Sequence, residues 1–216
     1  MKNSQKLLIV LLTISSFGFA QSVTIGSQTW TTKNLDVATF RNGEAIPQAK
    51  TEEEWTAAGV NKQASWCYYD YNPKNGVKYG KLYNWYAVND KRGLAPSGWH
   101  VPTYEEWKIL EFFLGEDEAA QKMKTLDDWE AVDETMGGVP GNNESGFRAL
   151  PAGAFAVDQE IETGEFFEIG ISTFYWSATK NYSNTWLYYW FGNLQIYEDT
   201  DESRLAWGCS VRCLKD

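Results

Sequence analysis

Residues 82–107 constrain the fold of this 216-residue chain more than any other segment. Residues 82–90 are rich in aromatic side chains, which bury a large area each and can build a core with few residues. A loop that contains glycine and proline, residues 93–102, leads from this run to Thr103. Because Thr103 stands three residues before Glu106, the pair has the spacing of a capping box that opens an α-helix. The segment therefore predicts a buried aromatic stretch, a turn and a helix start.

Two helices are predicted from a shared start signal. Thr51 and Thr103 each precede a glutamate by three residues, so a helix is expected to begin after each of them. The second helix is expected over 104–114, with Gly115 placed to end it. Its core-facing side chains, spaced by three and four residues, are Trp107, Leu110 and Leu114. A third, shorter helix is expected over 116–124.

Most of the second half of the chain predicts short strands. The run from Trp186 to Phe191 is apolar on both alternating faces, which indicates a strand covered on both sides or a strand whose second face binds a ligand. Gly192-Asn193 after it is a hairpin turn signal, and a final strand is expected over 205–214. Helices in the first half and strands in the second predict an α+β domain with an antiparallel sheet and long loops.

Residues 1–20 predict a secretory signal peptide that is removed from the mature chain, residues 21–216. Lys2 and Lys6 flank the polar start, an apolar run follows, and Ala20 supplies a small residue for cleavage. The apolar run is too short for a durable membrane span. We therefore expect one mature domain that is secreted, periplasmic or on the cell surface, without membrane insertion after cleavage.

The mature chain is strongly acidic. The sequence has 19 Lys and Arg against 29 Asp and Glu, so removal of Lys2 and Lys6 leaves 17 against 29 and a net charge near −12. Such a surface repels nucleic acid and anionic lipid, so neither is an expected partner. The 11 Trp, 12 Tyr and 11 Phe are mainly expected to fill the core, although rings of this kind also stack on sugars.

Three cysteines in an oxidising compartment predict one disulfide. Cys209 and Cys213 lie on one expected strand, about 13 Å apart at about 3.3 Å per residue, which exceeds the reach of a disulfide. One of them is therefore expected to pair with Cys67, and the other to keep a free thiol. The spacing does not fit a zinc site, and His100 is the one histidine of the chain.

Several motifs occur in order along the mature chain and carry a family resemblance. They are residues 28–30, 33–35, 41–43, 46–47, 79–88, 98–103, 143–147, 149–153, 175–179 and 210–213. The most distinctive are Tyr-Gly-Lys-Leu-Tyr-Asn-Trp-Tyr-Ala-Val and Gly-Trp-His-Val-Pro-Thr. Together they resemble the Fibrobacter succinogenes major paralogous domain family, which implies a bacterial protein of poorly defined biochemical role.

The resemblance also implies a fold and a disulfide partner. The family is similar to the C-type lectin-like fold of formylglycine-generating-enzyme-like domains. In that fold the chain ends pair, two to three short helices flank an antiparallel sheet, and a long loop region carries any binding site. The family pattern has an apolar residue at the position of Cys209, so the resemblance implies Cys213 as the partner of Cys67.

Catalysis is not expected from these residues. His100, placed just before a helix, is expected to be structural, so a hydrolytic triad has no base. Two cysteines on one strand cannot supply the close pair that a copper-dependent enzyme of the formylglycine-generating type requires. The glutamates of 160–168 alternate with uncharged residues in what is expected to be an exposed hairpin, where carboxylates are normally solvated.

With catalysis not expected, binding of a glycan or of calcium is the function that remains to consider. The rings selected as candidates for stacking on a glycan are Trp176, Trp186, Tyr188 and Trp190. The rival interpretation is that loops cover both faces of this strand, which would make the rings core residues. For calcium, Asp199, Asp201 and Glu202 lie on one loop with oxygen ligands, although the loop lacks the EF-hand spacing and acidic loops are common on an acidic protein.

The leading hypothesis is therefore a secreted or cell-surface recognition module for an extracellular glycan or protein. No catalytic activity is expected, and calcium is the one inorganic cofactor considered. The alternative is a purely structural or adhesive extracellular domain. A formylglycine-generating-enzyme-like enzyme is the third hypothesis.

Overall fold

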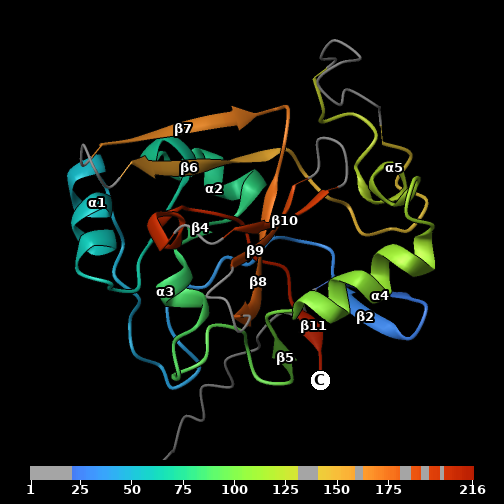
Figure 1. Cartoon of the computed structure of the whole chain (residues 1–216), viewed down its shortest axis with the longest axis horizontal. Coiled ribbons are helices and arrows are strands. Elements are labelled where there is room, and N and C mark those ends of the chain that lie inside the picture. The colour runs from blue at the N-terminus through green and yellow to red at the C-terminus, as the bar shows by residue number, and fades with distance from the viewer. Residues whose placement is uncertain (1–20, 131–140, 159–162, 181–185, 191–194, 200–201) are drawn as a thin grey trace, which may run out of the picture.

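The computed structural model describes residues 21–130, 141–158, 163–180, 186–190, 195–199 and 202–216 (Figure 1). For residues 158, 180, 186–190, 195–199, 202 and 203 it describes the backbone alone. The predicted signal peptide, residues 1–20, lies outside the described residues. No helix in the described part of the chain combines the length and apolar character that crossing a bilayer requires.

The described residues form a mixed α/β structure with short helices and small antiparallel sheets. The helices are α1 (Glu52–Val60), α2 (Pro73–Tyr79), α3 (Trp85–Val88), α4 (Tyr104–Leu114) and α5 (Ala119–Met123), with 3-10 turns η1 (Tyr69–Tyr71) and η3 (Glu202–Ala206). The strands of the first half are β1 (Ser22–Ile25), β2 (Gln28–Thr31), β3 (Trp66–Cys67), β4 (Leu82–Tyr83) and β5 (Trp99–His100). Those of the second half are β6 (Ala152–Asp158), β7 (Thr163–Ile169), β8 (Phe174–Lys180), β9 (Trp186–Trp190), β10 (Gln195–Asp199) and β11 (Leu214–Lys215).

The sheet of order β1-β2-β11-β5 joins the two ends of the described chain. Leu214 of β11 pairs with Trp30 of β2 on one side and with His100 of β5 on the other. Figure 1 shows β2 and β11 beside α4. The expected pairing of the chain ends is therefore confirmed. The other sheets have the orders β10-β9-β8, β3-β4 and β6-β7, and their strands are antiparallel.

Helix α4 begins and ends where the sequence predicts. The Thr103 side chain accepts from the Glu106 backbone N–H, and the Glu106 carboxylate accepts from the Thr103 N–H, so the capping box is formed. Gly115 ends the helix with a φ of 87°, a value that glycine adopts without strain. The predicted inward residues are buried in one cluster with Trp30, Phe147 and Tyr175: Trp107, Leu110 and Leu114.

Two other predicted elements differ from the structure. The third helix is α5, shorter than 116–124, because residues before it form a turn in which the Glu118 N–H donates to the Gly115 carbonyl. The prediction of a continuous strand over 205–214 is wrong. Residues 208–210 instead form single bridges to three different strands, with Gly208 opposite Phe155 of β6, Cys209 opposite Tyr83 of β4 and Ser210 opposite Tyr175 of β8. The segment therefore contacts three different sheets in turn and does not pair along one strand.

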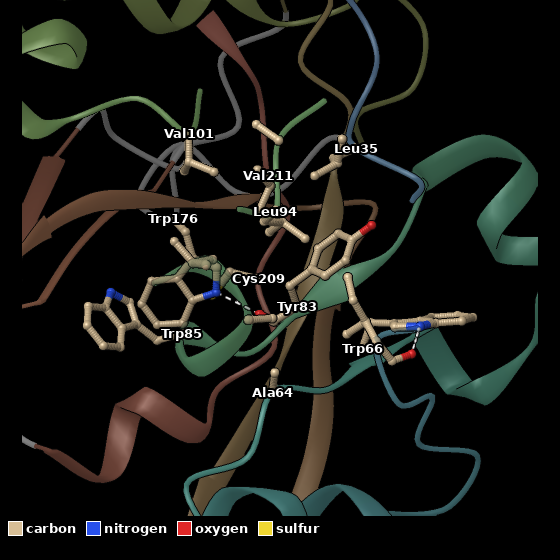
Figure 2. Close-up of a cluster of buried hydrophobic side chains, with 14 of the residues drawn as sticks. Leu35, Ala64, Trp66, Tyr83, Trp85, Leu94, Val101, Trp176, Cys209 and Val211 are labelled. Atoms are coloured by element: carbon tan, nitrogen blue, oxygen red, sulfur yellow. Dashed lines mark hydrogen bonds between the residues drawn. The ribbon is translucent and has the colours of Figure 1, made fainter. Parts of the chain in front are cut away.

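A second buried cluster brings together side chains from β3, β4, α3, β8 and the segment before β11 (Figure 2). Tyr83 is fully buried there, and its carbonyl accepts from the indole of Trp176 at 2.6 Å. The Trp66 indole donates to the Ile46 carbonyl at 2.9 Å. Hydrogen bonds of this kind let large polar rings be buried without leaving a donor unsatisfied.

The predicted disulfide between Cys67 and Cys213 is wrong. All three cysteines are free and buried. Cys67 pairs through β3 with Leu82 and packs in a cluster with Trp55 and Phe155. The Cys213 carbonyl instead accepts from the Thr31 N–H of β2, in a different cluster. The pairing fails because Cys67 lies on β3 in one buried cluster, whereas Cys213 directly precedes β11 and packs in another.

Candidate functional site

The predicted glycan-binding tryptophan of β8, Trp176, belongs to the core. It is 1% exposed, and Figure 2 shows it beside Trp85 with its indole directed to the Tyr83 carbonyl. No face of this ring is open to a sugar. The structure therefore supports the rival interpretation of Trp176 as a core residue.

The other predicted rings lie on β9, for which only the backbone is described. Tyr188 is opposite Trp176, and Trp190 is opposite Phe174, in the pairing with β8. Trp186 is opposite Asp199 in the pairing with β10. The side chains of Trp186, Tyr188 and Trp190 lie outside the described residues, so their role in binding a glycan stays a prediction.

The predicted calcium ligands are also incompletely described. Asp199 ends β10, Glu202 begins η3, and Asp201 lies outside the described residues. Within the part that the structure describes, no group of three or more His, Cys, Asp or Glu side chains is placed to hold a metal ion. Calcium binding at these three residues stays a prediction.

An open groove of about 730 Å³ lies beside α3. Three separate segments form it: a turn before α1, the residues just after α1, and α3 with the loop that follows. Its lining residues are Glu44, Lys62, Ala64, Trp85, Tyr86, Asn89, Asp90, Lys91 and Arg92. Trp85 is 5% exposed, so Tyr86, which is half-buried, is the ring that presents surface to the groove.

The buried side chain of Asn84 sets the position of these two rings. Its Oδ1 accepts from the Ala87 N–H at 3.1 Å, which caps α3, and from the Ser65 N–H at 3.0 Å. Its amide nitrogen donates to the Gln63 carbonyl at 2.7 Å. Because one side chain joins the start of α3 to the segment before β3, it fixes Trp85 and Tyr86 against the other wall of the groove.

Arg92 organises the charged wall of the groove. Its guanidinium donates to both carboxylate oxygens of Asp90, at 2.8 and 2.7 Å, and to Glu44 at 2.7 Å, and it lies 3.9 Å from the centre of the Phe40 ring. Hydrogen bonds from Arg92 hold the pKa of both Glu44 and Asp90 below the ordinary value. The two carboxylates therefore stay ionised into acidic conditions, and their oxygens are held in fixed positions.

The groove differs in charge from the rest of the chain. Its lining contains three cations, Lys62, Lys91 and Arg92, against two anions, Glu44 and Asp90, whereas the whole sequence has a net charge of −10. Among the described residues, Lys62 and Lys91 form no ion pair, and both are exposed. An aromatic ring, fixed carboxylates and available ammonium groups therefore share one open surface.

Sequence reasoning missed this groove. The run Asn89-Asp90-Lys91-Arg92 directly after an aromatic helix was an available signal, since charged residues beside rings often line binding surfaces. The contact between Glu44 and Arg92 joins residues 48 apart, so no local pattern shows it.

The other reactive side chains are held in structural positions. Burial raises the pKa of the Cys67 and Cys209 thiols, and it raises that of Cys213 to about 12, so these groups stay protonated and weakly nucleophilic. The two ring nitrogens of His100 contact Asp216 at 2.8 Å and Glu106 at 2.9 Å. Burial lowers the His100 pKa, but the hydrogen bonds to the two carboxylates outweigh it and raise the pKa overall. His100 thus joins β5, α4 and the segment after β11.

The order of sequence motifs along the chain identifies its family. No curated protein and no solved structure matches the chain. The sequence model of the Fibrobacter succinogenes major domain matches residues 23–215, which is nearly the whole of the predicted mature chain. The chain therefore belongs to the Fibrobacter succinogenes major domain family.

Proposed function

We propose that this protein is a secreted or cell-surface recognition module that binds an extracellular glycan in the groove beside α3. The single observation that carries the proposal is the half-buried ring of Tyr86 next to the fixed carboxylates of Glu44 and Asp90. Sugars combine apolar ring faces with hydroxyl groups, so a surface that offers a ring and oriented hydrogen-bond partners is suited to them. No catalytic step is part of this proposal.

The rigidity of the charged wall supports glycan binding. Arg92 is held by two carboxylates and by stacking on Phe40, so these side chains lose little conformational freedom when a ligand arrives. The carboxylates retain lone pairs that can accept hydroxyl protons, since each oxygen can accept more than one hydrogen bond.

A C-type lectin-like fold is part of the same proposal. Its support is the pairing of β11 with β2 and β5, which brings the chain ends into one sheet, together with short helices and long connections around it. The raised pKa of the buried thiols of Cys67, Cys209 and Cys213 counts against a formylglycine-generating-enzyme-like reaction, which needs a reactive sulfur pair.

A glycan array tests the proposed function. The purified protein is expected to bind a restricted set of glycans, and Tyr86→Ala is expected to weaken that binding at least tenfold. Tyr79→Ala is the matched control, because Tyr79 is also half-buried but does not line the groove. Absence of any glycan binding, or equal binding by the two variants, would contradict the proposal.

The outer face of α4 favours a second candidate, an adhesive role. Ile109, Phe112 and Phe113 are 50%, 79% and 61% exposed on this face, and adjacent exposed apolar side chains are typical of protein contact surfaces. Adhesion to immobilised cell-envelope material is then expected to fall in the Phe112→Ser, Phe113→Ser double variant and to persist in Tyr86→Ala. The opposite pattern would assign adhesion to the groove.

A further inference from the structure

We infer that the groove beside α3 selects acidic glycans, whose carboxylate or sulfate groups are held by Lys62 and Lys91. This inference rests on the proposed glycan-binding function and names the class of glycan. It concerns the two lysine side chains of the groove, which the aromatic and carboxylate contacts leave available.

The carboxylates of the groove already have cationic partners. Asp90 accepts from the backbone N–H of Arg92 at 2.9 Å as well as from its guanidinium, and Glu44 accepts from Arg92 and from Asn42. Neither carboxylate pairs with a lysine. The lining has three cations against two anions, a net charge of +1, and the two lysines are the cations that the carboxylates do not bind.

Backbone hydrogen bonds fix the main-chain positions from which the two lysine side chains extend. Lys62 follows the C-terminal end of α1, with a φ of 55° and its N–H donating to the Gly59 carbonyl at 3.0 Å. Lys91 lies in a tight turn in which the Gly93 N–H donates to the Asp90 carbonyl at 2.9 Å. Because Asp90 is occupied by Arg92, the neighbouring Lys91 ammonium keeps its hydrogen-bond donors for solvent or ligand.

The positive charge of the groove stands out because the rest of the chain is acidic. On a chain with a net charge of −10, unpaired cations at one open surface create a local region of favourable potential for an anion. A lysine ammonium is a point charge with three donors, so it can donate to the oxygens of a carboxylate or of a sulfate. The shared chemistry is therefore an anionic substituent on a sugar, whichever of the two groups supplies it.

Matched oligosaccharides test the inference by isothermal titration calorimetry. The probes are tetrasaccharides of galactose, glucose and mannose, each compared with the corresponding uronate and with a sulfated form. At low salt, at least one anionic member is expected to bind ten times more tightly than its neutral counterpart. Raising the sodium chloride concentration to 300 mM is expected to remove most of that advantage, because exposed charges are screened.

Lysine variants separate this inference from the proposed function. Lys62→Ala, Lys91→Ala is expected to abolish the preference, so that this variant binds the anionic and the neutral member with equal affinity. Lys33→Ala, Lys74→Ala is the control, since these exposed lysines are outside the groove. If neutral glycans bind as well as anionic ones, or if the preference survives in the Lys62, Lys91 variant, the inference is wrong and the glycan-binding function stands. If no probe of either kind binds, the proposed function itself fails.

Discussion

Arg212 and Arg92 both lie over aromatic rings, but their surroundings differ. Arg212 is fully buried, 4.7 Å from the centre of the Phe147 ring, and donates to the carbonyls of Thr31, Phe147 and Arg148 and to Asn34 Oδ1. Arg92 is about one third exposed, lies over Phe40, and pairs with two carboxylates. The first arginine satisfies backbone groups of distant segments, whereas the second holds charged groups at a surface.

This difference separates folding from recognition. Arg212 belongs to the Ser-Val-Arg-Cys motif that identifies the family, yet within the described residues it pairs with no carboxylate and reaches no solvent. Asn34, another motif residue, accepts from Arg212 and from the Tyr175 hydroxyl and donates to the Tyr79 carbonyl. The family motifs thus hold the core together. The charged residues of the groove that we propose for recognition, Glu44, Lys62 and Arg92, lie between or beside those motifs, whereas its exposed ring, Tyr86, belongs to the motif of residues 79–88.

The largest effect is expected from Arg212→Leu. This change leaves several buried carbonyl groups and Asn34 Oδ1 without a donor, and each unsatisfied buried group costs about 1–3 kcal/mol. We expect the free energy of unfolding to fall by about 3–5 kcal/mol, which urea titration followed by tryptophan fluorescence measures. Arg148→Leu is the control, because that side chain is exposed. A loss no larger than the control's would remove the distinction between the two arginines.

The second-largest loss of stability is expected from Asn84→Ala. This change tests the comparison of core and groove, because Asn84 is buried but supports the groove. The substitution leaves the Ser65 N–H and the Gln63 carbonyl without these partners, and the Ala87 N–H keeps only its bond to the backbone carbonyl of residue 84. We expect a loss of about 2–3 kcal/mol of stability in urea titration. Weakened glycan binding should accompany it, since Tyr86 loses its support. Asn89→Ala, an exposed asparagine of the same segment, should change stability little.

Local signals in the sequence predict local structure well, and the long-range contacts are what they miss. Thr103, Gly115 and the face of Trp107 define α4 correctly, because capping and helical spacing depend on residues a few positions apart. The predicted Cys67–Cys213 disulfide rested on the family resemblance and on the expected compartment, and no local pattern shows that the two cysteines pack in different clusters. The groove was missed for the same reason, since Glu44 meets Arg92 only after folding.

A smaller, pH-dependent effect is expected at His100. The folded pKa of His100 is raised above 6.5, so its contribution to stability is complete below that value and is lost as pH rises through the folded pKa. The folded pKa of Glu106 is lowered below 4.5, chiefly by hydrogen bonds to Thr103 and His100 that outweigh burial, so its contribution is lost as pH falls through the folded value. The pair should therefore stabilise the protein most between about pH 4.5 and 6.5.

Thermal unfolding of His100→Gln measures this contribution. The variant should be less stable than the wild type at pH 5.5, by about 1 kcal/mol or less because the pair is partly exposed, and the difference should shrink at pH 8.5. Asp216→Asn should show the same trend with a smaller amplitude, since it removes one of the two carboxylates. A difference that grows with pH would mean that His100 is neutral in the folded protein.

The smallest effect on stability is expected from Glu44→Gln, and it tests the comparison from the exposed side. Glu44 is at the surface and its contact with Arg92 is open to solvent, so the urea midpoint should not move measurably. Affinity for a neutral glycan should nevertheless fall, because Arg92 loses one of its two charged anchors and the wall loses a carboxylate acceptor. A shift in midpoint comparable to that of Asn84→Ala would show that the charged wall is a second structural cluster. Loss of binding without loss of stability is what distinguishes a recognition surface from a buried polar network, since a ligand site can be altered while the core remains satisfied.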